Sequence, residues 1–306
     1  MNKIIYLFCF LPIVMACNND DPGDVVFSAD ILNVRGTRYS ESKNSIEETY
    51  SNFIETLNAN QAISIIAEVD HAANARAVGR VLNPTKIVFF ANPNLGTPLL
   101  QKNQLAGLDL PQKVLFFEND DALVFAMYNS VAYLESRYQL QDTTTLGQVS
   151  VAVENLTSAA TESEVQRVSN LIVEIGEGII TVESTQNFEQ TYTSLEAAIS
   201  SEENFKIFAQ LDHQANASSV GMAIRPTKLI IFGNPNLETP LMQNSQTTGL
   251  DLPQKMLVWE DRNGIVKISY IDPLYLQQRH GISGNDSQVQ KIITILEKLA
   301  KAGAGI

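Results

Sequence analysis

The chain of 306 residues is about twice as long as a typical single domain, which predicts two domains. Hydrophobic residues make up 44% of it and charged residues 18%, as in globular proteins that bury a core. The net charge of −13 gives a surface that repels phosphate backbones and anionic lipid headgroups, so we expect no nucleic-acid partner.

The first 24 residues carry signals for export and anchoring. The apolar run over 4–16 follows a lysine and is too short for a mature membrane span. It ends in VMAC (14–17), which resembles the bacterial lipoprotein signal. We therefore expect a signal peptide over 1–16, a lipidated Cys17 and a polar tether over 17–24. The alternative is a plain secretory peptide with an incidental cysteine.

This signal sets the expected location and membrane partner. Lipidation of Cys17 would attach the protein to a membrane in the bacterial cell envelope. The outer membrane, on its periplasmic or surface side, is the expected place. The acidic tether leaves attachment to the acyl chains.

The remainder of the chain consists of two copies of one sequence repeat. Residues 70–119 and 212–261 are identical at 29 of 50 positions without a gap, at an offset of 142 residues. Such a long period is typical of tandem domains rather than of a solenoid. We expect repeat domains over 25–163 and 164–306 that pair within the chain, with a homodimer left open.

The second copy shows its elements most clearly, through alternating and helical apolar patterns. The patterns predict strands over 179–184, 205–212, 227–233, 254–261 and 265–272, and helices over 187–201, 213–221, 238–246, 274–280 and 289–302. Asp212 is predicted to cap one helix, Thr239 another, and Asn263-Gly264 to form a hairpin. The fold class is α+β. Each domain is expected to hold a mixed or antiparallel sheet of four to five strands covered by helices, and the two domains to pack as a pseudo-dimer.

Five phrases of the second copy together resemble a known family. They are DHQANA, RPTKLIIFGNPNLETPLM, GLDLP, VWED and SYIDPLYL, in that order from Asp212 onward. The chain is similar to tandem copies of the domain-of-unknown-function family 302. The resemblance implies a compact α+β domain that tends to pair with another copy. The family is uncharacterised, so it supplies no catalytic residues.

Repeated polar residues at the strand-to-helix loops form the candidate site. A histidine beside an aspartate suits a general base or a ligand contact, and free backbone N–H groups at a helix start suit a small anion. Loops on a rigid scaffold are also where binding residues gather. The predicted ligand-binding residues are Asp70, His71, Lys86, Asn92, Asn94 and Thr97 in the first copy and Asp212, His213, Lys228, Asn234, Asn236 and Thr239 in the second.

Each of these residues also has a structural interpretation. The aspartates fit N-caps, and the asparagines on either side of a proline fit Asx turns. Lysines at the heads of apolar strands, such as Lys113 and Lys255, fit solvated strand ends. Asp109 and Asp251 in GLDLP fit the residue ahead of an X-Pro bend.

Metal and cofactor motifs are missing from the sequence. It contains three histidines and no HExxH pattern, so we expect no metal site. It contains no GxGxxG, Walker or GxSxG motif, and we expect no cofactor.

Three classes of function follow. The leading hypothesis is an envelope protein that binds a small molecule or anion without turnover. The second is an enzyme that uses the Asp-His pair for general acid/base or hydrolytic chemistry, and the sequence favours this class less than binding without turnover. The third is a structural or interaction module.

Overall fold

The computed structural model describes residues 32–167 and 173–306. The predicted signal peptide, tether and lipidated Cys17 lie outside the described residues. So do residues 168–172, near the start of the predicted second repeat.

The first repeat alternates short strands with helices. Its strands are β1 (Thr37–Glu41), β2 (Ser64–Asp70), β3 (Thr85–Ala91), β4 (Gln112–Glu118), β5 (Val124–Asn129) and β6 (Gln166–Arg167). Its helices are α1 (Ile46–Ala59), α2 (His71–Ala77), α3 (Pro93–Lys102), α4 (Val131–Tyr138) and α5 (Thr143–Thr161), with a 3-10 turn η1 (Gln104–Leu108).

The second repeat has the same order of elements. Its strands are β7 (Ile179–Glu183), β8 (Lys206–Asp212), β9 (Thr227–Gly233), β10 (Gln254–Glu260) and β11 (Val266–Ile271). Its helices are α6 (Phe188–Ser201), α7 (His213–Ser219), α8 (Pro235–Asn244), α9 (Pro273–Arg279) and α10 (Asp286–Ala304), with a 3-10 turn η2 (Gln246–Leu250).

Both sheets are antiparallel, which confirms the predicted α+β class. The first has strand order β2-β3-β4-β5-β1-β6 and the second β7-β11-β10-β9-β8. The first sheet exceeds the expected four to five strands because the two-residue β6 pairs with the edge of β1. The second sheet has the expected five strands, and its β10–β11 hairpin closes at the predicted Asn-Gly turn.

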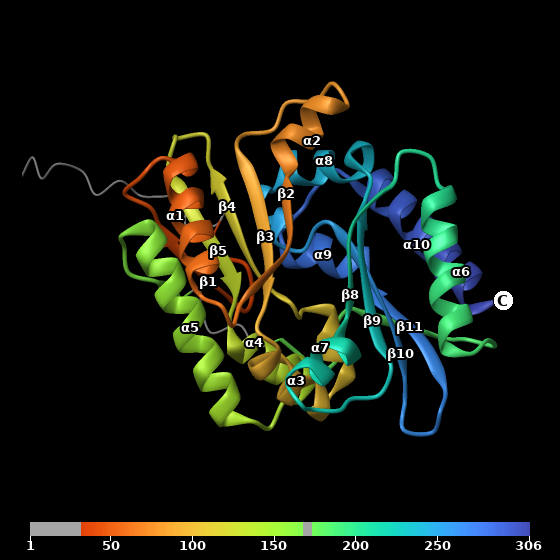
Figure 1. Ribbon diagram of the computed structural model, residues 1–306. Helices are drawn as coiled ribbons and strands as arrows, with labels where there is room; N and C mark the ends of the chain where they lie inside the picture. Colours follow the sequence, from red (N-terminus) through yellow and green to blue (C-terminus); the bar gives the residue numbers. More distant parts are fainter. Residues whose placement is uncertain (1–31, 168–172) are drawn as a thin grey trace, which may run out of the picture.

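The repeats pack as the predicted pseudo-dimer, in four layers of helix, sheet, sheet and helix (Figure 1). Successive residues of a strand point to opposite faces, so each sheet feeds two cores. In β3, Ile87 and Phe89 join a core shared by both repeats, whereas Val88 and Phe90 face the helices. In β9, Leu229 points into the same shared core.

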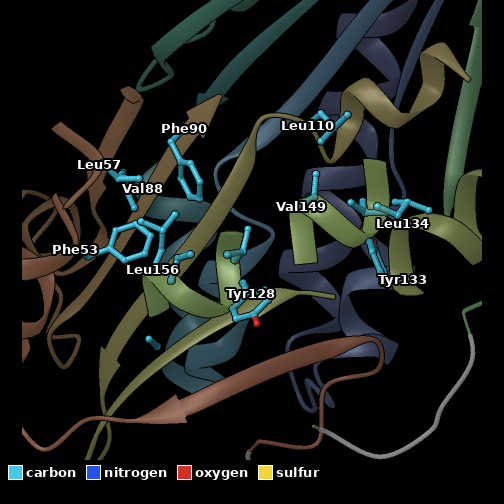
Figure 2. Close-up of a cluster of buried hydrophobic side chains, with 14 of the residues drawn as sticks. Phe53, Leu57, Val88, Phe90, Leu110, Tyr128, Tyr133, Leu134, Val149 and Leu156 are labelled. Atoms are coloured by element: carbon cyan, nitrogen blue, oxygen red, sulfur yellow. The ribbon is translucent and has the colours of Figure 1, made fainter. Parts of the chain in front are cut away.

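Long helices cover the outer face of each sheet. Helices α1 and α5 cover the first, and α6 and α10 cover the second (Figure 1). Figure 2 shows the core under α1 and α5, where Phe53 and Leu57 of α1 meet Val88 and Phe90 of β3. Both sheets are therefore buried on both faces, as their nearly continuous apolar strands require.

Short helices cross from one repeat to the other. Helix α7 packs against α3 of the first repeat, and α2 packs against α8 of the second (Figure 1). The histidine that opens each of these helices is buried. This exchange places residues of one repeat beside the loops of the other.

Two predicted helix starts are wrong. Helix α10 begins at Asp286 rather than at 289. Helix α8 begins at Pro235 with Asn234 as its N-cap, and the Asn234 side chain accepts from the Asn236 N–H. Thr239 is buried inside this helix and does not cap it. Both Asn-Pro and Thr-Pro fit a helix start, and the upstream pair forms it because β9 ends directly before Asn234.

Candidate functional site

A cluster of buried charges joins the two repeats. Each repeat contributes three residues: the aspartate of GLDLP, the lysine four positions later and an arginine from its short fourth helix. They are Asp109, Lys113 and Arg137 from the first repeat and Asp251, Lys255 and Arg279 from the second, all buried. The two lysines were expected in solvent, and the structure places them here because the two GLDLP turns meet at the interface.

Ion pairs link these residues across the interface. Lys113 Nζ donates to Asp109 Oδ1 at 3.1 Å and to Asp251 Oδ1 at 3.0 Å. Arg137 donates to Asp109 Oδ2 at 2.9 Å, and Arg279 to Asp251 Oδ2 at 2.6 Å. Lys113 thus pairs with the aspartates of both repeats. Buried charges are tolerated only when they are paired and hydrogen-bonded in this way.

The two lysines of the cluster differ in their surroundings, because Lys113 is paired with both aspartates and Lys255 with neither. Burial would raise the pKa of Asp251, but Arg279 and Lys113 outweigh it and hold that pKa well below its usual value. Burial and the nearby Lys113 hold the pKa of Lys255 well below its usual value, and its Nζ has no hydrogen-bond partner within the described chain. None of the cavities described below reaches Lys255. We therefore interpret the cluster as the joint between the repeats.

A separate pocket lies between the helices and sheet of the first repeat. Its volume is about 110 Å³. Phe90 of β3, Leu110 ahead of β4, and Val149 and Leu156 of α5 contribute to an almost wholly apolar wall (Figure 2). The loop and first turn of α3 form its polar rim. The second repeat completes it with two residues of α7, His213 and Asn216.

His213 lines this pocket as a buried polar residue, as Thr97 does. The His213 side chain lies against the backbone of Gly107 and Leu110, and its Nε2 has no hydrogen-bond partner among the described residues. Burial lowers its pKa to about 4, while Asp212 and those backbone groups act in the opposite direction. The imidazole is therefore neutral at pH 7 and carries one N–H donor. His71 has the same environment in the opposite repeat, against Gly249 and Leu252, with its pKa also lowered to about 4.

The structure separates the predicted residues within each repeat. Asp212 pairs with Lys228 at one end of the β8–β9 ladder, whereas Gly233, just ahead of Asn234, pairs with Lys206 at the other end. His213 and the Asn234–Thr239 loop of its own repeat are thus a strand length apart. His213 instead meets the Asn92–Thr97 loop of the first repeat.

The aspartates and lysines of the predicted set serve local structure. Asp212 accepts from the Ala215 N–H at 2.9 Å and Asp70 from the Ala73 N–H at 2.7 Å, as the predicted caps. Lys228 turns to the outer helix α6, where it pairs with Glu189 at 3.1 Å. Lys86 lies over the ring of Tyr50 at 5.0 Å. These four side chains are not part of the pocket wall.

The loop residues divide between the two repeats. Asn92 and Thr97 line the pocket, and the Asn92 side chain caps α3. Asn94 is exposed beside it. In the second repeat, the Asn236 carbonyl accepts from Gln288, and the buried Thr239 hydroxyl has no partner among the described residues.

Sequence reasoning missed Gln112, Asn216 and Gly96, which also line the pocket. One signal was available for Gly96. The phrases ANPNLGTPL and GNPNLETPL differ at two of nine positions, and Gly96 is one of them, with Glu238 in the other copy. Gln112 and Asn216 are half-buried, and their place in the pocket wall depends on packing between distant segments, so no local sequence pattern indicates it.

The geometry does not support the Asp-His general base. The Asp212 carboxylate is engaged as a helix cap, and within the described residues no carboxylate hydrogen-bonds to His213. A general base must lie within hydrogen-bond reach of its partners. His280 does bond a carboxylate, with its Nε2 2.9 Å from Asp251 Oδ2, but it belongs to the interface cluster.

A comparison with protein families identifies the repeated domain. The family model described as "Domain of unknown function DUF302" matches residues 39–163 and 180–301. A solved structure titled "Crystal structure of uncharacterized conserved protein DUF302 from Bacillus stearothermophilus" aligns with a TM-score of 0.38 at 20% identity. The alignment covers 41% of this chain and 98% of that one.

Two curated relatives are named as fluoride channels. "Fluoride-specific ion channel FluC 1" of Brucella suis biovar 1 is 39% identical over 132 residues, which cover 43% of this chain and 52% of that protein. The FluC 1 protein of Brucella abortus biovar 1 is 39% identical over 132 residues, 43% of this chain and 48% of its own length. This chain thus spans about half the length of the curated relatives it matches. Among the residues that the structure describes, no helix is long and apolar enough to cross a membrane.

Proposed function

This chain belongs to the DUF302 family, and from that premise we propose that it binds a small, largely apolar molecule in the first-repeat pocket without chemical turnover. One observation carries the proposal. A polar side chain with an unpartnered nitrogen, His213 Nε2, borders an apolar cavity that both repeats build. Binding sites for small molecules combine an apolar wall with few, fixed polar groups in this way.

The size of the pocket limits the ligand. A cavity of about 150 Å³ in another protein holds benzene. The volume of about 110 Å³ here therefore suits a ligand of roughly that size or slightly smaller. Its walls come from β3, β4, α3 and α5, so the site is built largely before the ligand arrives.

Filling the pocket should abolish binding. A Cβ at Gly96 would meet no atom within 4 Å, so the backbone admits a side chain, and Gly96→Leu should occupy the cavity while the chain still folds. We expect at least one compound from a panel of small acids, alcohols and aromatics to raise the melting temperature of the wild type by about 5 °C at 100 times its Kd. The same compound should not stabilise Gly96→Leu.

The control is Gly147→Leu, on an exposed turn of α5 where a Cβ also has open space. It should keep the ligand response of the wild type. If no compound in the panel stabilises the wild type, or if Gly96→Leu responds as the wild type does, the proposed pocket function is refuted.

We also propose that the chain acts at a membrane in the cell envelope, held by lipid on Cys17. The VMAC pattern at 14–17 supports this proposal. In cells that express the full chain, the wild type should fractionate with membranes and Cys17→Ser should move to the soluble fraction. Retention of Cys17→Ser in the membrane fraction would count against the lipid anchor.

A further inference from the structure

The second repeat has a smaller counterpart of the pocket in the corresponding place. It is lined by Phe205, Asn234, Leu237, Glu238 and Gln254, which correspond by the 142-residue offset to Ile63, Asn92, Leu95, Gly96 and Gln112 of the first pocket. Its volume is about 10 Å³ against about 110 Å³. The two repeats therefore build the same site, which is open in one and nearly full in the other.

The side chain of Glu238 fills the second site. This carboxyl is buried, and its Oε1 accepts from the Gln254 backbone N–H at 3.4 Å. A Cβ at Gly233 would lie 2.6 Å from Glu238 Oε2, so the glycine makes room for the carboxyl. The first repeat has Ala91 and Gly96 at these two positions. The two differences in the nine-residue phrase thus belong together as one exchange.

We infer that the ligand of the first-repeat pocket is a small monocarboxylic acid whose carboxyl group lies close to the position that corresponds to the Glu238 carboxyl in the second repeat. This inference rests on the proposed function. Gln112 stands on β4 as Gln254 stands on β10, opposite Phe90 and Phe232 respectively. Its backbone therefore borders the same volume, and Gly96 has no side chain to enter it.

Two features of the first pocket favour a free carboxylic acid over the carboxyl group of a side chain at position 96. The Ala91 methyl occupies space that Gly233 leaves open, so a ligand carboxyl must sit slightly farther from β3 than the Glu238 carboxyl does from β9. A free molecule can make that shift, whereas a side chain attached at position 96 is held by its backbone. His213 also lines this pocket and carries a neutral imidazole N–H, and hydrogen bonds to carboxylates are among the stronger ones.

The test compares two probes that differ in their polar end. Butanoate and 1-butanol share a four-carbon chain, which keeps both within the size that the pocket admits, and isothermal titration at pH 7 measures their affinities for the full chain. We expect butanoate to bind the wild type at least ten times more tightly than 1-butanol. In the double variant Ala91→Gly/Gly96→Glu, which copies the second repeat, we expect neither probe to bind. Gly147→Glu adds the same charge at an exposed site and should bind as the wild type does.

The outcomes separate this inference from the proposed function. If both probes bind the wild type equally and the double variant binds neither, the pocket function stands and the carboxyl assignment is overturned. If neither these probes nor any compound of the panel binds, the proposed function itself is refuted. If butanoate binds the double variant as it binds the wild type, the acid lies outside this pocket and the inference is wrong. Circular dichroism and thermal melting establish that the double variant is folded.

Discussion

Asp251→Asn should lower the free energy of unfolding by about 3–5 kcal/mol, because it removes one member of a buried ionic cluster. Asp251 accepts from Lys113 at 3.0 Å, Arg279 at 2.6 Å and His280 at 2.9 Å, and it is buried. The asparagine keeps the shape of the side chain, but it has no charge and one of its two polar atoms is an NH₂ donor, which cannot accept from Lys113 or Arg279. The change therefore leaves buried cations without their counter-charge.

Urea unfolding at pH 7 measures this loss. The matched control is Glu189→Gln, which removes the carboxylate that pairs with Lys228 but is 71% exposed. Exposed ion pairs contribute about 1 kcal/mol at most, so this variant should unfold almost as the wild type does. A loss below about 1 kcal/mol for Asp251→Asn would show that the cluster does not hold the repeats together.

Acidification from pH 7 to pH 4 should destabilise the fold through two of its buried histidines, His71 and His213. Burial lowers the pKa values of His71 and His213 to about 4 from their ordinary value of 6.5. As the pH falls below 6.5, these two histidines become protonated in the unfolded chain but stay neutral in the folded chain. Their contribution is therefore fully present above pH 6.5 and is lost as the pH falls to 4. At about 1.4 kcal/mol per pKa unit, each histidine contributes about 3 kcal/mol.

Urea unfolding at several pH values between 4 and 8 tests this. The double variant His71→Gln/His213→Gln should show a much shallower loss on acidification than the wild type. Glu238→Gln provides a control of opposite sign, because burial raises the pKa of Glu238 to about 8 from 4.5. Its contribution is present below pH 4.5 and is lost as the pH rises to 8, so Glu238→Gln should reduce the loss on the alkaline side. Identical pH profiles for the wild type and the double histidine variant would contradict the buried, neutral histidines.

The secondary structure could be predicted well wherever local pattern decides it. The strand over 227–233 has the predicted bounds, and Asp212 caps α7 as expected. An apolar alternation or a capping side chain acts within a few residues, so its consequence can be read locally. The start of α8 was misplaced because two cap-proline pairs compete within one stretch, and the position of β9 decides between them.

The candidate site could be predicted only in part. His213, Asn92 and Thr97 belong to the predicted set and meet in one pocket. The sequence grouped His213 with the loop of its own repeat, whereas the crossing of α7 brings it to the loop of the other. The two segments share seven of nine residues, and neither carries a local sign of which distant side chain it will meet, so the packing of the sheets decides the pairing.

The sequence by itself determined that this protein is a duplicated α+β domain, because duplication preserves letters and apolar periodicity within each copy. The tertiary structure decided what the differences between the copies mean. The exchange of Ala91 and Gly96 for Gly233 and Glu238 is two letters in the sequence, but in space it opens one pocket and fills the other. Likewise, the sequence around Lys113 is typical of a strand end in solvent, whereas in the structure the second repeat places Asp251 in contact with this lysine. Cavities and buried charges depend on what packs across the interface, and that information is not local in the chain.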